Sequence, residues 1–538
     1  MKRIVSILLC FAIVFGIALS LSSCHGRKMM NDFVMPDGLE EGRVYEITFW
    51  AKNDSNATQI EIYEKAIENF EALYPNIKVN LKRYTNYGLI YQDVITNIGT
   101  GTTPNVCITY PDHIATYNTT DNIVVPLDEL VADDKYGLGG SAIRFDAPEL
   151  SEIVPQFVAE GQINGEQYAL PYMRSTEACY INVDLIKALG YDGVPEVLTW
   201  DFVWEVSEAA MQPIGKDKDG RDIYVNGQNV IYPFIYKSTD NMMIQYLAQS
   251  GADYSTPEGD ILLYNETSKE LLSEVADHVR SGAFTTFSAI GYPGNFFNLG
   301  QCIFAIDSTA GATWMGPEAP LIEVPEDKLV NFEVAVTTVP QVNEENPKMI
   351  SQGPSICVFN KEDPTEVLAS WIFAQYMLTD EVQIAFAQTE GYIPVTKTAQ
   401  SNPEYVDYLS RAGEDNELYY DVKIEASKVM LDNLESTFTT PVFVGSASVR
   451  NAAGELIESV VKAISRKQPT DSAALDKMYD KLVAQYRLDH LGANSNKPVE
   501  LGKIPDGAVA LIISLGGIWL ALGAWVLIKY LLARKSKQ

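Results

Sequence analysis

The chain has 538 residues, more than the roughly 250–300 residues that one hydrophobic core supports, so we expect at least two lobes. Hydrophobic residues make up 46% and charged residues 21% of the sequence, which is typical of a folded protein and excludes a disordered or fibrous one. The 40 Lys and Arg against 71 Asp and Glu give a formal net charge of -31, which argues against binding to nucleic acids or anionic lipid surfaces, because both attract basic proteins.

The first residues have the pattern of a secretory signal. Two basic residues precede an uncharged apolar run from Ile4 to Leu21. The run ends in Leu21-Ser22-Ser23-Cys24, which resembles the lipobox of bacterial lipoproteins, where the Cys receives the lipid. We predict a lipoprotein signal peptide over residues 1–23 and lipidation at Cys24; the alternative is an uncleaved anchor helix with an incidental Cys.

The folded part is expected to begin near residue 44, after a polar tether over residues 24–43 that lacks periodicity. Ile47 to Trp50 is a short apolar run, and apolar residues then recur at helical spacing until Pro75. Residues 77–82 alternate between apolar and polar side chains, as a strand does. Strand, helix and strand in this order predict a parallel βαβ unit with a right-handed crossover.

The same alternation continues along the chain and predicts an α/β protein. A helical segment from Leu89 to Ile98 is followed by a glycine break and by a strand from Val106 to Tyr110. The acidic segment Asp217 to Asp222 lacks the ligand spacing of an EF-hand, and an Asp-Gly turn in a β-hairpin explains it better.

Four cysteines remain in the predicted domain once Cys10 and Cys24 are assigned to the signal and the lipid site. Each lies in an apolar, strand-like run without metal-binding spacing, so we expect small buried thiols, no metal site and no disulfide framework. They are Cys107, Cys179, Cys302 and Cys357.

An ordered series of segments over about residues 44–490 resembles a known family. The segments are Phe70-Glu-Ala-Leu-Tyr-Pro-Asn-Ile-Lys-Val79, Gly101-Thr-Thr-Pro-Asn-Val106, Asn164-Gly-Glu-Gln-Tyr-Ala-Leu-Pro171, Tyr180-Ile-Asn-Val-Asp-Leu185, Thr199-Trp200, Phe304-Ala-Ile-Asp307 to Trp314, and Gly391-Tyr-Ile-Pro-Val395. They are similar to those of the bacterial extracellular solute-binding proteins of the maltose and glycerol-phosphate type, which serve ABC importers. The resemblance implies a periplasmic-binding-protein-like fold, with two α/β lobes, a ligand cleft between them and no cofactor.

The resemblance also implies a division of the chain. Lobe 1 is expected over residues 44–172 with 307–355, and lobe 2 over residues 173–306 with 356–490. The chain is then expected to cross between lobes near Pro171 to Glu177, near Asp307 and near Ser351 to Cys357. Residues 456–486 resemble the closing helices of the family.

The expected cleft residues combine aromatic and polar side chains. Trp50 and Trp314 each end a strand-like run before a polar turn, where an aromatic face could stack on a sugar. The resemblance adds Tyr87, Asp112, Tyr392 and Arg450, whose guanidinium suits phosphate or vicinal hydroxyls. The complete expected set is Trp50, Lys52, Asn53, Tyr87 and Asp112 from lobe 1, and Trp314, Tyr392 and Arg450 from lobe 2.

Three positions depart from the two branches of the family. Pro111 stands where the glycerol-phosphate branch has Glu, and Thr109 and Ser446 replace aromatic residues of the maltose branch. The ligand therefore stays open between a carbohydrate and a glycerol-phosphate-like solute.

The last part of the chain is predicted to reach a membrane. A polar linker over residues 491–507 leads to an uncharged apolar stretch over residues 508–528, about the length that a membrane-spanning helix needs. The basic tail over residues 529–538 is then expected in the cytoplasm by the positive-inside rule. A cell-wall sorting signal is the alternative, although the usual Thr-Gly is missing.

Together these features favour an extracytoplasmic, membrane-anchored binding protein that closes its lobes around a small polar solute and delivers it to importer permease subunits. A sugar-sensing or adhesion ectodomain is one alternative, but few residues follow Ile528 to form a signalling domain. An exported glycan hydrolase is another. The sequence has four His and lacks nucleophile and phosphate-loop motifs, so we expect no enzyme.

Overall fold

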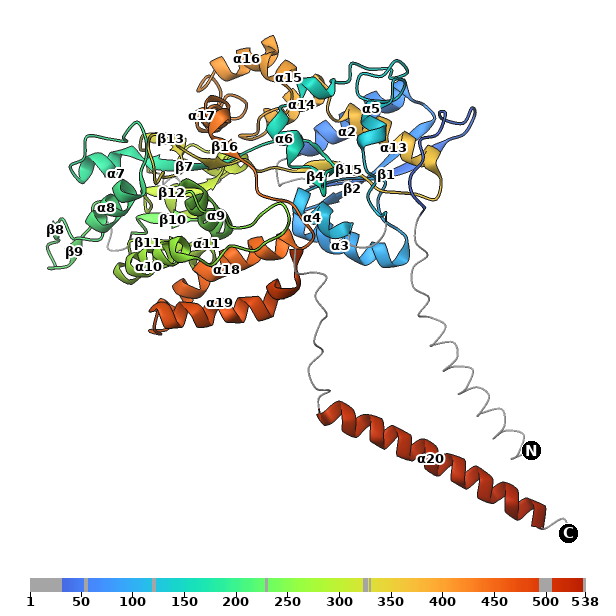
Figure 1. The fold of residues 1–538 in the computed structure, drawn as a ribbon. Helices are drawn as coiled ribbons and strands as arrows, with labels where there is room; N and C mark the ends of the chain where they lie inside the picture. The colour runs from blue at the N-terminus through green and yellow to red at the C-terminus, as the bar shows by residue number, and fades with distance from the viewer. Residues whose placement is uncertain are drawn as a thin grey trace. The chain divides into compact units, whose positions relative to one another are not determined.

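The computed structural model describes residues 31–52, 57–118, 122–227, 231–322, 328, 330–492 and 506–535. The chain divides into two units, residues 1–493 and residues 494–538. The first unit contains two lobes, each built on its own β-sheet (Figure 1).

Lobe 1 is built on a five-stranded sheet in the order β2-β1-β3-β15-β6. Its strands are β2 (Ile77–Tyr84), β1 (Tyr45–Lys52), β3 (Val106–Thr109), β15 (Ser355–Val358) and β6 (Leu170–Pro171). Strand β1 pairs in parallel with β2, from Tyr45 opposite Ile77 to Lys52 opposite Tyr84, and helix α2 (Ala57–Leu73) connects them. The predicted βαβ unit is therefore confirmed. Strand β15 runs antiparallel to both β3 and β6.

Helices pack on this sheet and bury its aromatic core. They are α2, α3 (Tyr87–Thr100), α4 (Pro111–Tyr117), α5 (Asp128–Ala132), α6 (Pro155–Ala159), α13 (Pro364–Tyr376), α14 (Asp380–Ala387), α15 (Lys397–Ser401) and α16 (Pro403–Ser410). The ring of Phe373 on α13 lies 5.1 Å from the rings of both Phe49 and Phe70. Aromatic pairs at this separation add to the stability given by burial alone.

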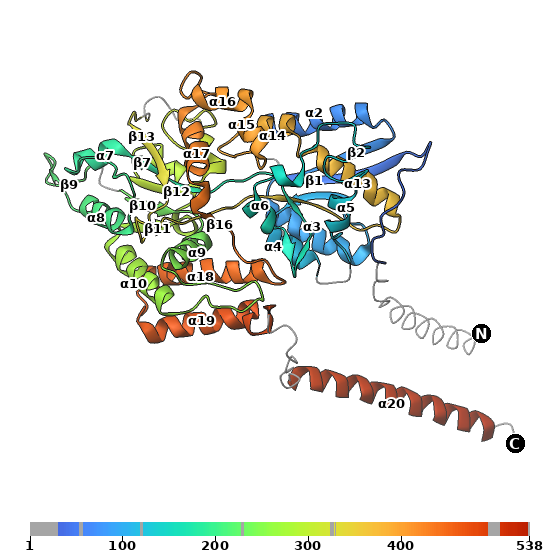
Figure 2. The same ribbon diagram turned by 45° about the horizontal axis from the view of Figure 1, so that its top comes forward.

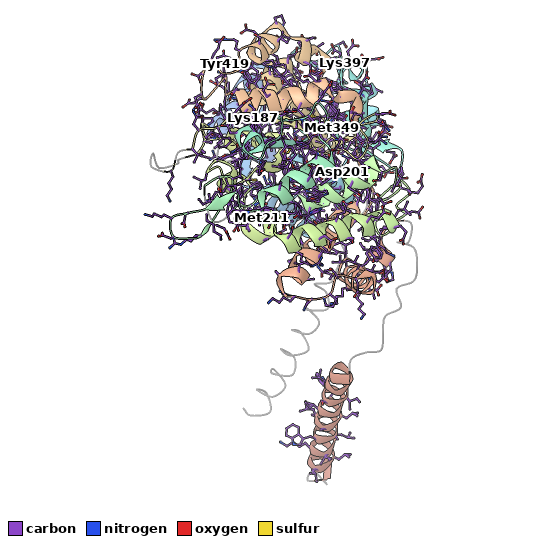
Figure 3. The ribbon with its side chains drawn as sticks, turned by 90° about the vertical axis from the view of Figure 1, so that its left-hand side faces the viewer. Lys187, Asp201, Met211, Met349, Lys397 and Tyr419 are labelled. Carbon is purple, nitrogen blue, oxygen red and sulfur yellow. The ribbon has the colours of Figure 1, made fainter. Side chains whose placement is uncertain are left out.

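Lobe 2 has a second five-stranded sheet in the order β11-β10-β12-β7-β13. Its strands are β11 (Phe284–Thr286), β10 (Phe234–Tyr236), β12 (Phe304–Ser308), β7 (Glu177–Asn182) and β13 (Val334–Thr338). Its helices are α7 (Val183–Ala188), α8 (Trp200–Ala210), α9 (Thr239–Gln249), α10 (Glu266–Ser281), α11 (Phe287–Ile290), α12 (Gly294–Phe297), α18 (Ser446–Ser465) and α19 (Ser472–Tyr486). Figure 3 looks onto the outer helices of this lobe, with Lys187 of α7 and Asp201 of α8.

Three stretches of chain connect the lobes and form the hinge. The first lies between β6 and β7, and the second between β14 (Met349–Ile350) and β15. The third leads from α17 (Asp421–Asp432) to β16 (Thr437–Phe438), which pairs in parallel with β14. Ser175 of the first stretch exchanges backbone hydrogen bonds with Gln352 of the second, at 2.8 and 2.9 Å.

The structure divides the chain differently from the expected division. Strand β12 continues through the short helix η2 (Thr309–Trp314) to β13, which pairs with β7, so the chain stays in lobe 2 beyond Asp307. Residues 355–410 instead complete lobe 1, and helix α17 packs on β13 and η2 beside the hinge (Figure 2). Backbone pairing and packing decide this, because β13 pairs with β7 of the lobe 2 sheet, whereas α13 packs on β1 and β15 of the lobe 1 sheet.

Several local expectations are confirmed. Cys107, Cys179, Cys302 and Cys357 are all free and buried. The Asp217 to Asp222 segment is a hairpin between β8 (Gly215–Lys216) and β9 (Asp222–Ile223). Part of the expected tether, by contrast, is not a free linker, because Phe33, Met35 and Leu39 pack against the core of lobe 1.

The structure contradicts the expected membrane-spanning helix. Helix α20 (Asp506–Lys535) covers the predicted stretch over residues 508–528. Nevertheless, no helix among the described residues is both long and apolar enough to cross a membrane.

Candidate functional site

A cavity of about 340 Å³ lies between the two lobes, next to the hinge. Its walls come from the start of α3 and α4 in lobe 1, from the start of α9 and α18 in lobe 2, and from the hinge itself. The lining residues are Tyr87, Gly88, Tyr110, Pro111, Asp112, His113, Glu160, Ser238, Asp240, Asn241, Ser351, Gln352, Gly353, Thr440, Val442, Ala447, Arg450 and Asn451. The volume falls in the range of small-molecule sites, which begins at roughly 300 Å³.

Local sequence signals place these side chains. Asn86 caps α3 by accepting a hydrogen bond from the Leu89 N–H, and this fixes Tyr87 at the start of the helix. Pro111 occupies the first turn of α4, where its missing N–H costs nothing, and Asp112 follows it. Gly445, at a φ of 96°, precedes α18 and sets the position of Arg450.

Arg450 is the centre of the polar network in the cavity. Its Nη2 donates to Asp240 Oδ2 at 2.9 Å and to Asn241 Oδ1 at 2.6 Å, both on α9. Its Nε lies 4.0 Å from Asp112 Oδ2 of lobe 1, so this ion pair joins the two lobes. Burial by itself would lower the pKa of Arg450, but Asp240 and Asp112 raise it above its ordinary value. The guanidinium is therefore charged and already paired before any ligand binds.

The network continues from the cavity to the hinge. Asn241 Nδ2 donates to Gln352 Oε1 at 2.9 Å, and Gln352 Nε2 donates to Ser308 Oγ at 3.0 Å. The backbone of Gln352 is paired with Ser175, as described above. A ligand that moves Asn241 or Arg450 would thus act directly on the strands that connect the lobes.

Aromatic rings form the wall that lobe 1 contributes. The rings of Tyr87 and Tyr110 lie 4.6 Å apart, and Tyr110 lies 5.6 Å from the ring of His113. His113 Nδ1 is 3.0 Å from the Thr109 hydroxyl. Burial lowers the pKa of His113 below its ordinary value, so its imidazole is neutral at physiological pH.

A buried ion pair forms the floor of the cavity. Glu160 lines the cavity, and its Oε2 lies 2.8 Å from Nη2 of Arg174, whose side chain is fully buried. Arg174 Nη1 also donates to the carbonyls of Met173 and Pro354, both at 2.9 Å. Burial raises the pKa of Glu160, and Arg174 opposes this increase. Arg174 therefore holds two of the three hinge stretches together.

The structure brings together some of the expected site residues. Tyr87, Asp112 and Arg450 line the cavity. Lys52 lies next to it, with its Nζ 5.5 Å from the centre of the Tyr87 ring. Asn53 lies outside the described residues.

The other three expected aromatic residues do not line the cavity. Trp50 is buried against Tyr84, with ring centres 5.4 Å apart, because its strand continues to Lys52 and turns the indole into lobe 1. Tyr392 is buried in the core of lobe 1 against Phe386, instead of belonging to lobe 2 as expected. Trp314 ends η2, and its carbonyl accepts a hydrogen bond from Asn298.

Sequence reasoning missed the acidic and amide residues that surround Arg450. Asp240 and Asn241 lie in Ser238-Thr-Asp-Asn241, a run typical of a helix start, which could have indicated side chains at a cavity edge. Glu160 and Gln352 carry no local signal. Among the described residues, no group of three or more His, Cys, Asp or Glu is placed to hold a metal ion.

The cavity contains hydroxyl, amide and carboxylate groups next to aromatic faces. Such groups bind hydroxyls by hydrogen bonds and the apolar face of a ring by stacking. Three carboxylates, from Asp112, Glu160 and Asp240, line the cavity together with a single guanidinium, that of Arg450. The arrangement is suited to an uncharged, hydroxylated molecule more than to an anion.

The chain is similar to known binding proteins in sequence. A model of the family described as bacterial extracellular solute-binding protein matches residues 65–412. A binding protein of Brucella abortus (strain 2308) is 22% identical over 350 residues, which cover 64% of this chain and 75% of the relative. A binding protein of Brucella suis biovar 1 matches to the same extent.

Solved structures of low sequence identity share the fold. The GacH receptor of Streptomyces glaucescens, solved unliganded and with acarbose, has a TM-score of 0.60 and 16% identity, covering 82% of this chain and 99% of that chain. UgpB of Mycobacterium tuberculosis, solved with glycerophosphocholine, has a TM-score of 0.61 and 17% identity over 84% of this chain and 98% of that chain. Maltose-bound MalE3 of T. maritima has a TM-score of 0.59 and 17% identity over 82% of this chain and 99% of that chain.

Proposed function

The chain belongs to the bacterial extracellular solute-binding proteins, and from this premise we propose that it captures an uncharged carbohydrate outside the cytoplasm for an ABC importer. The observation that carries the proposal is the cavity between the lobes, where Arg450 of lobe 2 faces Asp112 of lobe 1 across 4.0 Å. A ligand bound there contacts both lobes, so its binding free energy favours their closure. The role requires no turnover of the ligand.

The pairing of Arg450 supports a carbohydrate over a glycerol phosphate. A phosphate would have to displace Asp240 and Asn241 from Nη2, which they contact at 2.9 and 2.6 Å. It would also be repelled by the nearby carboxylates. Hydroxyl groups can instead accept from the remaining guanidinium donors and donate to the carboxylates. Solved relatives of this fold bind acarbose, maltose and glycerophosphocholine, and the first two are carbohydrates.

Calorimetry with defined probes tests the proposal. The purified protein is titrated with glucose, maltose, maltotriose, cellotriose and sn-glycerol 3-phosphate, and native mass spectrometry checks for chemical change of each probe. We expect at least one saccharide to bind and to be recovered intact, and the phosphate to bind more weakly. Preferential binding of the phosphate, or hydrolysis of a saccharide, would contradict the proposal.

We further propose that Cys24, which lies outside the described residues, carries a lipid that keeps the protein at the outer face of the membrane. The lipobox-like sequence before it supports this assignment. Cells that express the protein are fed a labelled fatty acid. The label is expected in the wild-type protein and absent from Cys24→Ala, while equal labelling of the two would contradict the assignment.

A further inference from the structure

Two buried cysteines of lobe 1 lie directly opposite each other on neighbouring strands. Cys107 of β3 and Cys357 of β15 are Cα partners in an antiparallel pair, although 250 residues separate them in the sequence. Both side chains belong to the same buried cluster, on one face of the sheet. Cys357 Sγ donates to the Cys107 carbonyl at 3.6 Å. Burial raises the pKa of the Cys107 thiol, and the neighbouring Cys357 thiol raises it further, so the two thiols are in close proximity.

The backbone spacing at this pair is compatible with a disulfide. The Phe359 N–H donates to the Asn105 carbonyl at 2.9 Å, so by the alternation of the ladder Cys107 and Cys357 also form a hydrogen-bonded pair. The Cα atoms of such pairs lie about 5.5 Å apart, within the roughly 4.4–6.8 Å that disulfides span. Their Cβ atoms lie up to about 5.5 Å apart, whereas a disulfide needs about 3.5–4.5 Å. The strands must therefore move slightly closer, and the bond carries some strain.

The two cysteines of lobe 2 lack this arrangement. Cys179 of β7 lies opposite Ile306 and packs in the core cluster on one face of the sheet. Cys302 precedes β12 and packs in the cluster on the other face, with Tyr180. The sheet separates these two thiols, so they serve as an internal control for any chemistry of the opposed pair.

We propose that Cys107 and Cys357 are a redox pair that forms a cross-strand disulfide outside the cytoplasm, where disulfides persist. The thiolate of one cysteine attacks the disulfide of a small-molecule or protein oxidant, which gives a mixed disulfide and releases one thiol of the oxidant. The thiolate of the second cysteine attacks the first cysteine's sulfur and releases the other thiol. Two electrons pass to the oxidant, and the two protons of the cysteines end on its thiols.

Burial determines when this exchange takes place. Both thiols are fully buried and free in the structure, which therefore holds the pair in its reduced form. An oxidant reaches them only while the exported chain folds, before β15 closes on β3. Once formed, the bond is shielded from reductants by the same burial.

The disulfide joins two strands that support the interlobe cavity. Strand β3 leads to Tyr110 in the cavity wall, and β15 follows the hinge stretch that contains Gly353. Both cysteines lie in lobe 1, so the bond does not cross the hinge and leaves the lobes free to move. It closes a loop between residues 250 apart, which lowers the entropy of the unfolded chain, while strain offsets part of the gain.

Refolding with glutathione tests the pair. The full-length protein is unfolded with dithiothreitol, freed of reductant and refolded with either oxidised or reduced glutathione. Each product is unfolded, its free thiols are blocked with iodoacetamide, and its peptides are mapped by mass spectrometry without reduction. After oxidised glutathione we expect the Cys107 peptide joined to the Cys357 peptide, lighter by two hydrogen atoms than the two thiol peptides together. Cys179 and Cys302 should carry the blocking group under both conditions.

Melting temperatures and two variants separate the bond from other effects of the oxidant. The oxidised wild type should melt about 2–5 °C above the reduced wild type. Cys357→Ala removes one partner but keeps a small apolar side chain, so it should lose both the joined peptides and the difference in melting temperature. Cys302→Ala is the matched control and should keep both.

The outcomes that contradict the proposal are distinct. It is overturned if oxidised glutathione gives no joined Cys107 and Cys357 peptides, or if Cys357→Ala shows the same rise in melting temperature as the wild type. Joining of Cys107 to Cys179 or Cys302 would also overturn it, because the oxidant would then link thiols that the fold keeps apart.

Discussion

Glu177 makes the stability of the protein depend on pH between its ordinary pKa and its pKa in the folded state. The side chain is fully buried at the start of β7, and Tyr236 and Gln245 donate to its Oε2 at 2.7 and 2.8 Å. Burial raises the pKa of Glu177 from 4.5 to about 8, although hydrogen bonds from Tyr236 and Asn241 lower it. The folded protein therefore keeps a proton on Glu177 at pH values where the unfolded chain has released it.

The sign of the effect follows from this difference in protonation. Between pH 4.5 and about pH 8 the folded state binds one more proton at Glu177 than the unfolded state does, so the free energy of unfolding falls as pH rises. The contribution of Glu177 is fully present below pH 4.5 and is lost as pH rises through about 8. Each pH unit carries about 1.4 kcal/mol, so the total loss is at most about 5 kcal/mol.

The substitution Glu177→Gln tests this reasoning, because a neutral amide can accept from Tyr236 and Gln245 as the protonated carboxyl does. Urea unfolding at pH 5, 6, 7 and 8 gives the free energy of unfolding of both proteins. The variant should gain stability relative to the wild type as pH rises, by about 2–5 kcal/mol over the whole interval. Glu258→Gln, at an exposed position, is the control and should follow the wild-type profile. Identical pH profiles for Glu177→Gln and the wild type would refute the reasoning.

Three further predictions concern the hinge, the cavity and a buried lysine. Arg174→Met leaves Glu160 buried without its cation, so the free energy of unfolding measured in urea should fall by about 3–5 kcal/mol. The double variant Arg174→Met/Glu160→Leu should recover most of this loss, because it leaves no buried charge. An unchanged stability of Arg174→Met would contradict the prediction. Asp240→Asn removes one carboxylate that pairs with Arg450. In calorimetry the variant should bind sn-glycerol 3-phosphate about tenfold more tightly than the wild type does. Equal affinities would show that Asp240 does not set the charge preference of the cavity. Burial lowers the pKa of Lys423 from 10.5 to about 8, so the folded state has released a proton that the unfolded state still binds. Urea unfolding should therefore show the wild type gaining about 2–3 kcal/mol of stability relative to Lys423→Met as pH rises from 8 to 10. A constant difference between the two proteins would refute the prediction.

The local structure of lobe 1 could be predicted from the sequence because its signals depend on near neighbours. The helical spacing that ends at Pro75 and the alternation over residues 77–82 gave the βαβ unit with the correct elements. The ordered family segments likewise predicted two lobes and the bacterial extracellular solute-binding family.

The composition of the site depended on contacts that are distant in the sequence. Arg450 was expected in the cleft, but its partner Asp240 lies 210 residues earlier, and no local pattern connects them. An aromatic residue near the end of a strand has the same local signature whether it faces a ligand or the next strand, and Trp50 faces Tyr84. The expected membrane-spanning helix was wrong, because no helix among the described residues is both long and apolar enough to cross a membrane.

The sequence alone therefore determined the α/β class, the two lobes, the family and the order of the elements, because periodicity and short motifs act over a few residues. Only the tertiary structure decided that β13 stays with lobe 2, that β15 completes lobe 1 and that Tyr392 belongs to a core. It also decided that the Arg450 guanidinium meets two carboxylates. These outcomes depend on which surfaces, distant in the sequence, bury each other. The free energy gained by burying apolar surface depends on both segments that meet, so it cannot be read from either segment alone.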